Sequence, residues 1–352
     1  MQKNICIAIL NVFIFSLIYS NAFGQSKQYK IIVGGFYNLE NFFDTINDPK
    51  TFDDDFTPNG SMHYSAEIYK DKIKHLEQVV AQIGTDLSPD GMAFWGTAEI
   101  ENKEVVVDLV NQPSLKNRNY QVVHYNGSDP RSIDCGFVYN PKYFKLLYSK
   151  SIPIDLRLAV KDAKPTRDVL FVQGILNLDD TISVFVGHWP SRRGGEEVTK
   201  PMRNYVAKVI KQYSDSLIAV SPNSKVIVMG DLNDNPTDES LIKYLNTAAK
   251  PEKCTEKGFY SPWIDYFKKG IGTLAHNDAW GLFDQIIFSK AWLNKNQNGF
   301  FFHKAYIFKK DFMMQKTGKY KGYPKRTWDF NIYNAGYSDH LPTYIAFLKE
   351  IK

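Results

Sequence analysis

The chain has few cysteines and none of the clustered side chains that a soft-metal site requires. Three cysteines occur among 352 residues, and their spacing matches no disulfide framework. No His or Cys pair has the short spacing of a zinc site. A glycine-rich phosphate loop and a Gly-x-Ser-x-Gly elbow are missing too, which excludes the enzyme classes built on those motifs. We expect Cys135 and Cys254 to be unpaired thiols.

Linkers, repeats and strong charge bias are also lacking. No low-complexity tract divides the sequence, so we predict a single catalytic domain over residues 25–352, with a core large enough to be stable without disulfides. The net charge is +5, without a polybasic arm. This balance permits an anionic partner but does not require one. We expect a monomer.

The first 24 residues have the pattern of a signal peptide. Lys3 precedes an apolar run over residues 5–19, and Ala22 and Gly24 supply the small residues before a cleavage site. The run is short for a membrane span, and no second span follows. We therefore predict export to the periplasm or the outside of the cell, without a stable membrane anchor. An uncleaved N-terminal anchor is the alternative.

Short apolar runs recur through the rest of the chain and predict strands. They cover residues 31–37, 92–97, 120–125, 136–139, 169–178, 182–187, 226–229, 283–288, 300–308 and 343–348. Apolar residues at three- and four-residue spacing predict helices over 65–83 and 198–218, with a shorter one over 240–245. This mixture favours mixed sheets with helices outside, and the number of strands favours two packed sheets.

Polar residues follow many of these apolar runs. Acidic, amide and histidine side chains stand at six strand ends, which suggests one shared rim. They are Asn38, Glu40, Glu99, His188, Asp231, Asn233, Asp284, Asp339 and His340. Asp231 and Asn233 are two residues apart, so in an extended chain they face the same side. Carboxylate and amide oxygens favour Mg²⁺, with Mn²⁺ or Ca²⁺ as alternatives.

Six ordered motifs resemble those of the endonuclease/exonuclease/phosphatase superfamily, which includes deoxyribonucleases and inositol-polyphosphate phosphatases. Gly230-Asp231-Leu232-Asn233 is the most specific. The others are Phe36-Tyr37-Asn38-Leu39-Glu40-Asn41, Thr97-Ala98-Glu99-Ile100-Glu101-Asn102, Gly187-His188-Trp189-Pro190-Ser191, Phe283-Asp284-Gln285-Ile286-Ile287 and Ser338-Asp339-His340-Leu341-Pro342. The resemblance implies a four-layer α/β/β/α sandwich, with two packed mixed β-sheets flanked by helices, and divalent-metal-dependent hydrolysis of phosphate esters.

The resemblance also implies a role for each residue. Glu99 would bind the metal, with Asn38, Glu40 and Asp339 at the same end of the site. Asp231 would orient or deprotonate the attacking water, and Asn233 would hold the phosphate. His340 would contact a phosphate oxygen while Asp284 fixes its ring. His188 matches a second histidine of the deoxyribonuclease branch.

Cations near these motifs suggest substrate contacts. Arg192 and Arg193 directly follow the His188 strand beside two glycines, and Arg131 lies in a loop that should return to the rim. Guanidinium groups suit phosphate recognition. Arg167 is a weaker candidate. Aromatic and cationic residues also mix over residues 320–328, where base stacking or plain loop packing is possible.

The substrate is left open by these patterns. A secreted nuclease, most simply an endonuclease, is favoured by the pair His188 and His340. A phosphatase or phosphodiesterase for an inositol phosphate, a nucleotide or sphingomyelin is the alternative. A membrane-docking hairpin for sphingomyelin would need exposed aromatics, and Phe300-Phe301-Phe302 instead has the pattern of a buried strand. A non-catalytic binding protein is a third hypothesis, which the complete motif set disfavours.

Overall fold

Two mixed β-sheets form the centre of the molecule in the computed structural model, which describes residues 27–351. The six-stranded sheet has the order β14 (Phe301–Ile307), β17 (Thr343–Ile351), β1 (Gln28–Phe42), β2 (Phe94–Ile100), β4 (Asp134–Tyr139) and β3 (Gln121–His124). The seven-stranded sheet has the order β5 (Phe144–Ile152), β6 (Val169–Leu176), β7 (Asp180–His188), β8 (Lys225–Asp231), β13 (Asp284–Ser289), β10 (Phe259–Tyr260) and β9 (Thr247–Ala248).

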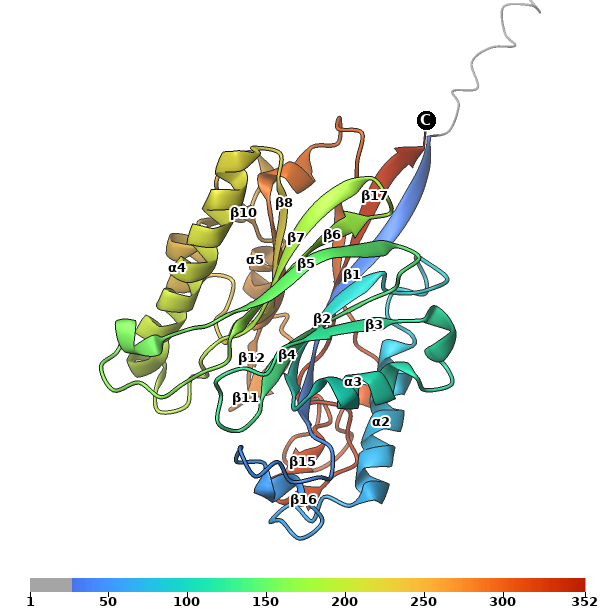
Figure 1. The fold of residues 1–352 in the computed structure, drawn as a ribbon, viewed down its shortest axis with the longest axis vertical. Helices are drawn as coiled ribbons and strands as arrows, with labels where there is room; N and C mark the ends of the chain where they lie inside the picture. Colours follow the sequence, from blue (N-terminus) through green and yellow to red (C-terminus); the bar gives the residue numbers. More distant parts are fainter. Residues whose placement is uncertain (1–26, 352) are drawn as a thin grey trace, which may run out of the picture.

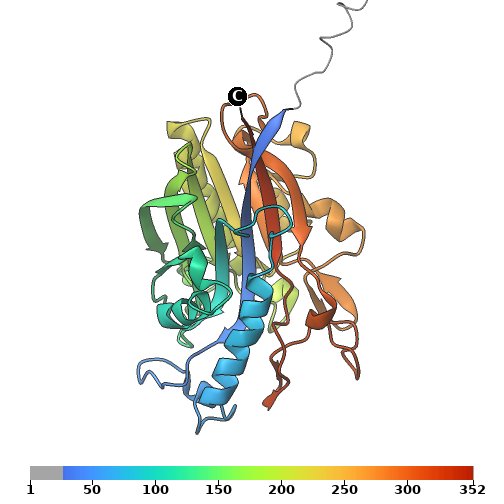
Figure 2. The same ribbon diagram turned by 90° about the vertical axis from the view of Figure 1, so that its right-hand side faces the viewer.

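Helices cover the outer faces of these sheets, which confirms the predicted four-layer sandwich. The helices α2 (Ala66–Val80) and α3 (Lys103–Val110) lie on one side, and α4 (Glu196–Val220) lies on the other (Figure 1). Figure 2, turned by 90°, shows α2 in front of the long strands β1 and β17, which pair antiparallel. Side chains of Ser65 and Asn102 cap the N-termini of α2 and α3, as helix starts require.

In the described part of the chain, the two larger of three hydrophobic clusters fill the layers. The larger contains inward residues of both sheets, such as Phe36, Phe94 and Val184, together with Val206 and Ile210 of α4. The second lies between the six-stranded sheet and α2, with Leu76 and Val79 among its members. A core of this size explains the lack of disulfides, and Cys135 and Cys254 are both buried free thiols, as predicted.

Several elements differ from the sequence expectations in detail. The helix expected over 240–245 is a π-helix, Ser240–Tyr244. The strand β5 and the helices α3 and α5 (Trp263–Lys268) were not predicted. Two small hairpins also occur, formed by β11 (Leu274–His276) with β12 (Ala279–Gly281) and by β15 (Trp328–Asp329) with β16 (Ile332–Tyr333). Phe301 and its neighbours form the edge strand β14, in which Phe301 is buried and Phe302 half-buried but His303 and Lys304 are exposed.

The predicted signal peptide, residues 1–24, lies outside the described part of the chain. Within residues 27–351, no helix has the length and apolar character needed to span a membrane.

Strand register brings polar residues of the seven-stranded sheet to one rim. In the parallel pair β7 and β8, His188 lies opposite Asp231. In the antiparallel pair β8 and β13, Asp284 also lies opposite Asp231. Gly230 permits this close approach, because a Cβ there would lie 1.9 Å from the carbonyl oxygen of Gly187. The position before Asp231 therefore requires glycine, because no side chain fits between the two strands there.

Candidate active site at the rim of the two sheets

Asp231 lies at the centre of the rim, where side chains from both sheets meet. Its carboxylate is buried and accepts a hydrogen bond from Nδ2 of Asn38 at 3.1 Å. The backbone N–H of Asn233 donates to its other oxygen, also at 3.1 Å. Burial, with the carboxylates of Asp284 and Glu99, raises the pKa of Asp231 to about 7, against the lowering effect of His340. A carboxylate with this pKa can accept a proton from water near neutral pH.

Glu99 faces Asp231 from the six-stranded sheet. Nδ2 of Asn38 lies 3.1 Å from Oε1 of Glu99, so one amide group links the two carboxylates. Oδ1 of Asn38 accepts the backbone N–H of Glu40 at 2.9 Å, which fixes this amide orientation. The backbone N–H of Asn41 donates to Oε2 of Glu99 at 2.9 Å. Asn38 therefore presents donors, not its oxygen, to both acids.

The backbone around Glu99 is irregular and strained. The pairing of β1 with β2 shifts register between Asn38 and Phe42. Glu40, Asn41 and Glu99 have φ angles of 49°, 48° and 59°, in the left-handed region that non-glycine residues avoid. Each such residue costs about 1–3 kcal/mol and persists only where its surroundings hold it. A bulge of this kind re-aims side chains, and here it directs Glu99 toward Asp231.

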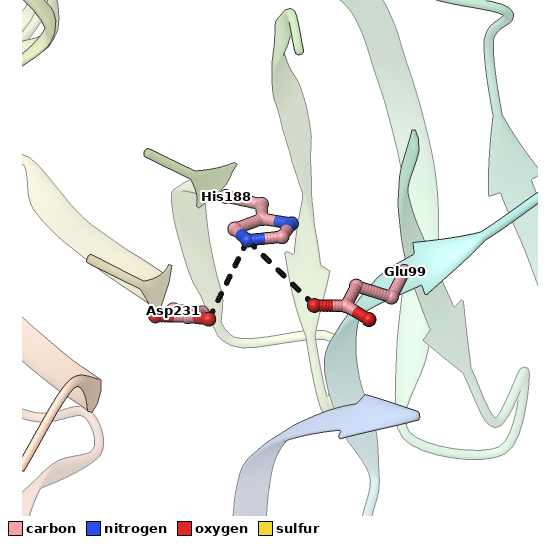
Figure 3. Close-up of side chains that lie close together, drawn as sticks. All are labelled: Glu99, His188 and Asp231. Carbon is pink, nitrogen blue, oxygen red and sulfur yellow. Dashed lines mark ion pairs between the residues drawn. The ribbon is translucent and has the colours of Figure 1, made fainter. Parts of the chain in front are cut away.

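His188 completes a group of three potential metal ligands. Its Nε2 lies 3.5 Å from Asp231 Oδ2 and 3.9 Å from Glu99 Oε1 (Figure 3). One ligand atom from each residue lies within 4.8 Å of the others. Burial lowers the pKa of His188 well below its usual value, and the nearby cations Arg167, His340 and Arg131 lower it further. A neutral imidazole and two carboxylates form a donor set that fits a divalent cation.

His340 differs from His188 in its charge. Nδ1 of His340 lies 2.7 Å from Oδ2 of the fully buried Asp284. Burial alone would lower the pKa of His340, but the carboxylates of Asp284, Asp231 and Asp339 outweigh burial and raise the pKa well above its usual value. His340 is therefore an imidazolium at neutral pH, with Nε2 3.8 Å from Asp231 Oδ2 and free to donate to an anion.

Asn233 is fixed beside this group. Its φ of 49° is left-handed, and its Nδ2 donates to the carbonyl oxygen of Trp189 at 3.0 Å. Arg167 holds the same carbonyl from the other side, through Nη2 at 2.6 Å, and the carbonyl of His188 through Nε at 3.1 Å. Arg167 thus positions the end of β7, a role that its sequence context did not indicate.

Glu40 and Asp339 lie beside the group of three but have other partners. The carboxylate of Glu40 accepts the backbone N–H of Thr327 at 2.7 Å and that of Asp339 at 3.0 Å. Asp339 pairs with Arg326 at 3.1 Å, and its Oδ1 lies 3.9 Å from His340 Nε2. Glu40 therefore holds the loop that carries Asp339 and His340.

The predicted substrate-binding arginines have different surroundings. Arg192 forms ion pairs with Glu196, Asp234 and Asp238 at 2.6, 3.1 and 2.5 Å, so its guanidinium is already engaged. Arg131 pairs with Asp129 at 2.8 Å but has a half-exposed side chain. Arg193 is exposed. Arg131 and Arg193 line one cavity of about 860 Å³ with Arg167 and Lys164, which we call the cationic groove.

Two buried cations beside the site were missed in the sequence. Lys72 of α2 donates to the carbonyl of Glu40 at 2.6 Å and to Thr327 at 2.9 Å. Arg203 of α4 is fully buried and pairs with Asp234 at 2.6 Å. Both lie on the apolar face of a helix that the sequence predicted, and a cation at such a position is the signal that could have identified them.

This assembly of carboxylates, amides and one charged histidine suits attack of water on a phosphate ester. Comparison with known proteins leads to the same chemistry, because a sequence model described as "Endonuclease/Exonuclease/phosphatase family" matches residues 33–349. The chain belongs to the endonuclease/exonuclease/phosphatase family. Members of this family are phosphoric ester hydrolases, and the family assignment confirms the resemblance found in the motifs.

Solved structures of this family share the fold at low identity. D. rerio TDP2 complexed with a single-strand DNA product is 15% identical, with a TM-score of 0.54 and coverage of 90% of this chain and 99% of that one. A family protein from Bacteroides thetaiotaomicron is 14% identical, with a TM-score of 0.55 and coverage of 93% and 98%. A mannosyl-6-phosphatase from the same organism is 13% identical, with a TM-score of 0.50 and coverage of 91% and 100%. No curated protein matches the sequence.

Proposed function

We propose that the protein is an exported, divalent-metal-dependent phosphodiesterase that acts on nucleic acid. The main support for this proposal is the cationic groove, whose residue Arg167 contacts the backbone carbonyl of His188. Four cations line the groove, and Asp129 is the single acid in its lining; the cations are Arg131, Lys164, Arg167 and Arg193. Surplus positive charge beside the reaction centre suits the flanking phosphates of a polynucleotide strand. A substrate with a single phosphate, such as a hexose 6-phosphate, has no second anionic group to place there.

The imidazolium of His340 donates a hydrogen bond to the reacting phosphate. Because Asp284 holds Nδ1, the Nε2–H of His340 is directed to the rim, where a non-bridging oxygen can accept it. A fixed positive donor of this kind stabilises the charge that builds on the phosphate in the transition state. Asn233 has a second Nδ2 hydrogen beyond the one that it gives to Trp189, and this hydrogen can serve the same phosphate.

Asp231 aligns the attacking water and receives its proton. Nδ2 of Asn38 and the backbone amide of Asn233 keep the carboxylate of Asp231 oriented for this role. Neutral His188 adds no charge that would compete for this carboxylate. The proton passes from water to Oδ of Asp231 as the oxygen attacks phosphorus in line with the leaving group.

Glu99, with His188 and Asp231 beside it, would hold the cation. A bound Mg²⁺ or Mn²⁺ supplies Lewis acidity toward a phosphate oxygen and the leaving oxygen. Asn38 and the backbone of Asn41 orient Glu99 for this contact.

A substrate panel tests the proposal. Purified protein with Mg²⁺ or Mn²⁺ is given single- and double-stranded DNA, RNA, bis-p-nitrophenyl phosphate, inositol phosphates, sphingomyelin and hexose 6-phosphates. We expect polynucleotides to have the highest kcat/KM, and Asp231→Asn protein controls for contaminating nucleases. Turnover of a monoester without cleavage of any polynucleotide would refute the nuclease.

A phosphatase for a phosphorylated small molecule is the second candidate. A compact cavity of about 350 Å³ beside Asp339 is the observation that favours it, since a sugar or nucleoside could occupy this space.

Export rests on the sequence of residues 1–24. Fractionation of expressing cells, with N-terminal sequencing of the protein, tests it, and we expect a mature chain that begins near Gln25.

A further inference from the structure

A second cavity adjoins the active site at Asp339, separate from the cationic groove. Its volume is about 350 Å³, within the range of about 300–1,000 Å³ common for small-ligand pockets. Asp339 forms part of its wall, and Oδ1 of this residue lies 3.9 Å from Nε2 of His340. A group bound in this cavity therefore lies directly beside the reacting phosphate. We call the cavity the aromatic pocket, after Tyr320, Tyr323 and Phe330 in its lining.

The walls of the aromatic pocket combine ring faces with polar edges. The rings of Tyr320 and Tyr323 have centroids 5.8 Å apart, and the Arg326 guanidinium lies 5.9 Å from the Tyr320 ring. Asp278 fixes Tyr323, whose hydroxyl donates to its carboxylate at 2.7 Å and accepts its backbone N–H at 2.6 Å. Arg326 is held in turn by Asp339. The cavity is therefore lined by fixed aromatic rings together with charged and hydrogen-bonding groups.

Phe330 contributes an aromatic side chain at an unfavourable backbone position. It is the first turn residue of the hairpin β15–β16, where Asp329 pairs with Ile332. Its φ is 53°, in a region where hairpin turns normally use glycine, and its side chain is 86% exposed. Folding gains almost nothing from an exposed ring at a strained position. Strain held by a rigid hairpin at the edge of a pocket points to a binding role.

We propose that the aromatic pocket binds the base of the nucleotide next to the scissile phosphate, stacked against Phe330 and Tyr320. This inference rests on the proposed nuclease function. A base in this pocket cannot remain stacked and paired in a duplex, so the substrate is single-stranded or frayed at the cleavage point. The cationic groove, which shares no lining residue with the aromatic pocket, then receives the backbone of the same strand.

Cleavage of a strand with one missing base tests the proposal. The substrate is an end-labelled single-stranded thymidine oligonucleotide with a single abasic residue near its middle. Wild-type protein should cut all phosphodiester bonds at similar rates except the one that would place the abasic residue in the pocket. That bond should be cut about tenfold more slowly, the effect of losing one base–aromatic stack. The result is a one-bond gap in the ladder, or a pause if the enzyme works from one end.

Phe330→Gly should make the gap clearly shallower, because only the stack on Tyr320 then remains. Its melting temperature should stay the same or rise, since glycine suits the left-handed position. Leu178→Gly is the matched control. Leu178 is also apolar, 84% exposed and left-handed (φ 62°) at a hairpin turn, but it lies on the order of 25 Å away along β7 from His188. This variant should keep the gap.

The outcomes separate this inference from the proposed function. An even ladder from wild-type protein would overturn the base pocket and leave the nuclease intact. A gap of unchanged depth in Phe330→Gly protein would show that this ring does not bind the base. Absence of any cleavage, with turnover of a hexose phosphate instead, would remove the nuclease and the base pocket together.

Discussion

Oδ2 of Asp284 lies 2.7 Å from Nδ1 of His340, and both side chains are buried. The two residues come from different sheets, β13 and the segment before β17. Burial of an imidazolium is unfavourable unless a carboxylate pairs with it, and Asp284 supplies that pairing. The hydrogen bond also leaves Nε2 as the group directed at the substrate. This pair gives the site one permanent cation without a lysine or arginine.

The first prediction is that Asp284→Asn narrows the pH range of activity. His340 must be protonated to donate, so activity is present below its pKa and lost as pH rises through it. Asp284 raises that pKa; its removal lowers the pKa, and the alkaline limb of kcat/KM should move down by about one pH unit or more. The pH profile of a small diester measures this. Asp215→Asn, a carboxylate change on the outer helix α4, should leave the profile unchanged. An unshifted limb in Asp284→Asn would contradict the role of the pair.

The second prediction is that Asp231→Asn loses activity while the fold is retained or stabilised. Turnover should fall at least about a hundredfold, the usual scale for loss of a general base. Burial raises the pKa of Asp231 to about 7. A folded-state pKa above the unfolded value of about 3.9 means that the charged form weakens the fold as pH rises from about 4 to 7. Thermal melts between about pH 4 and 7 should show that wild-type protein loses stability as pH rises, and that Asp231→Asn protein does not show this effect.

The third prediction separates Glu99 from Glu40. Glu99 belongs to the candidate ligand group, so Glu99→Gln should raise the Mg²⁺ or Mn²⁺ concentration needed for half-maximal activity by at least about tenfold. Glu40 holds backbone amides, so Glu40→Gln should mainly lower the melting temperature. Metal titrations and thermal melts of both variants distinguish the metal-binding role of Glu99 from the structural role of Glu40. Full activity of wild type in excess EDTA would refute the metal requirement itself.

The fourth prediction concerns the two cysteines. Burial raises the pKa of Cys254 to about 11 and that of Cys135 further. A thiol at such a pKa is almost entirely protonated at pH 8, and only the thiolate reacts quickly. Native protein that starts at Gln25 should therefore react slowly with Ellman's reagent, whereas denatured protein should titrate two thiols without reductant. Absence of free thiols after denaturation would indicate a disulfide.

Much of the site could be predicted because its residues stand at strand ends. Asp231 and Asn233 follow an apolar run of the seven-stranded sheet, and His188 follows the neighbouring one, so parallel pairing places them together. The same argument covers Glu99 and Asn38 in the other sheet. Apolar runs and ordered motifs are local signals that a sequence retains. Alternation along an extended chain did not place Asn233, because β8 ends at Asp231 and Asn233 has a left-handed φ of 49°.

Contacts between distant segments could not be predicted in this way. Neutral His188 and charged His340 have the same side chain and are equally buried, so only their charged neighbours separate them. The sequence predicted that Arg192 contacts the substrate. In the structure Arg192 forms ion pairs with Asp234 and Asp238, which follow a different strand and are about forty residues away in the chain. The strand β5 was missed because it lies at a sheet edge and has many half-exposed polar residues.

The last prediction follows from these different surroundings of the two adjacent arginines. Exposed Arg193 lies in the cationic groove, so Arg193→Ala should weaken DNA binding and reduce the dependence of log K on log salt by about one charge. Arg192 is committed to Glu196, Asp234 and Asp238. Its replacement by alanine leaves these acids unpaired, so Arg192→Ala should lower the melting temperature and leave the salt slope nearly unchanged. Binding of a fluorescent single-stranded oligonucleotide by Asp231→Asn protein, with each arginine change added, measures the slopes without cleavage. Equal slopes for the Arg193→Ala protein and its parent would mean that the cationic groove does not contact phosphates, and the nuclease proposal would lose its main support.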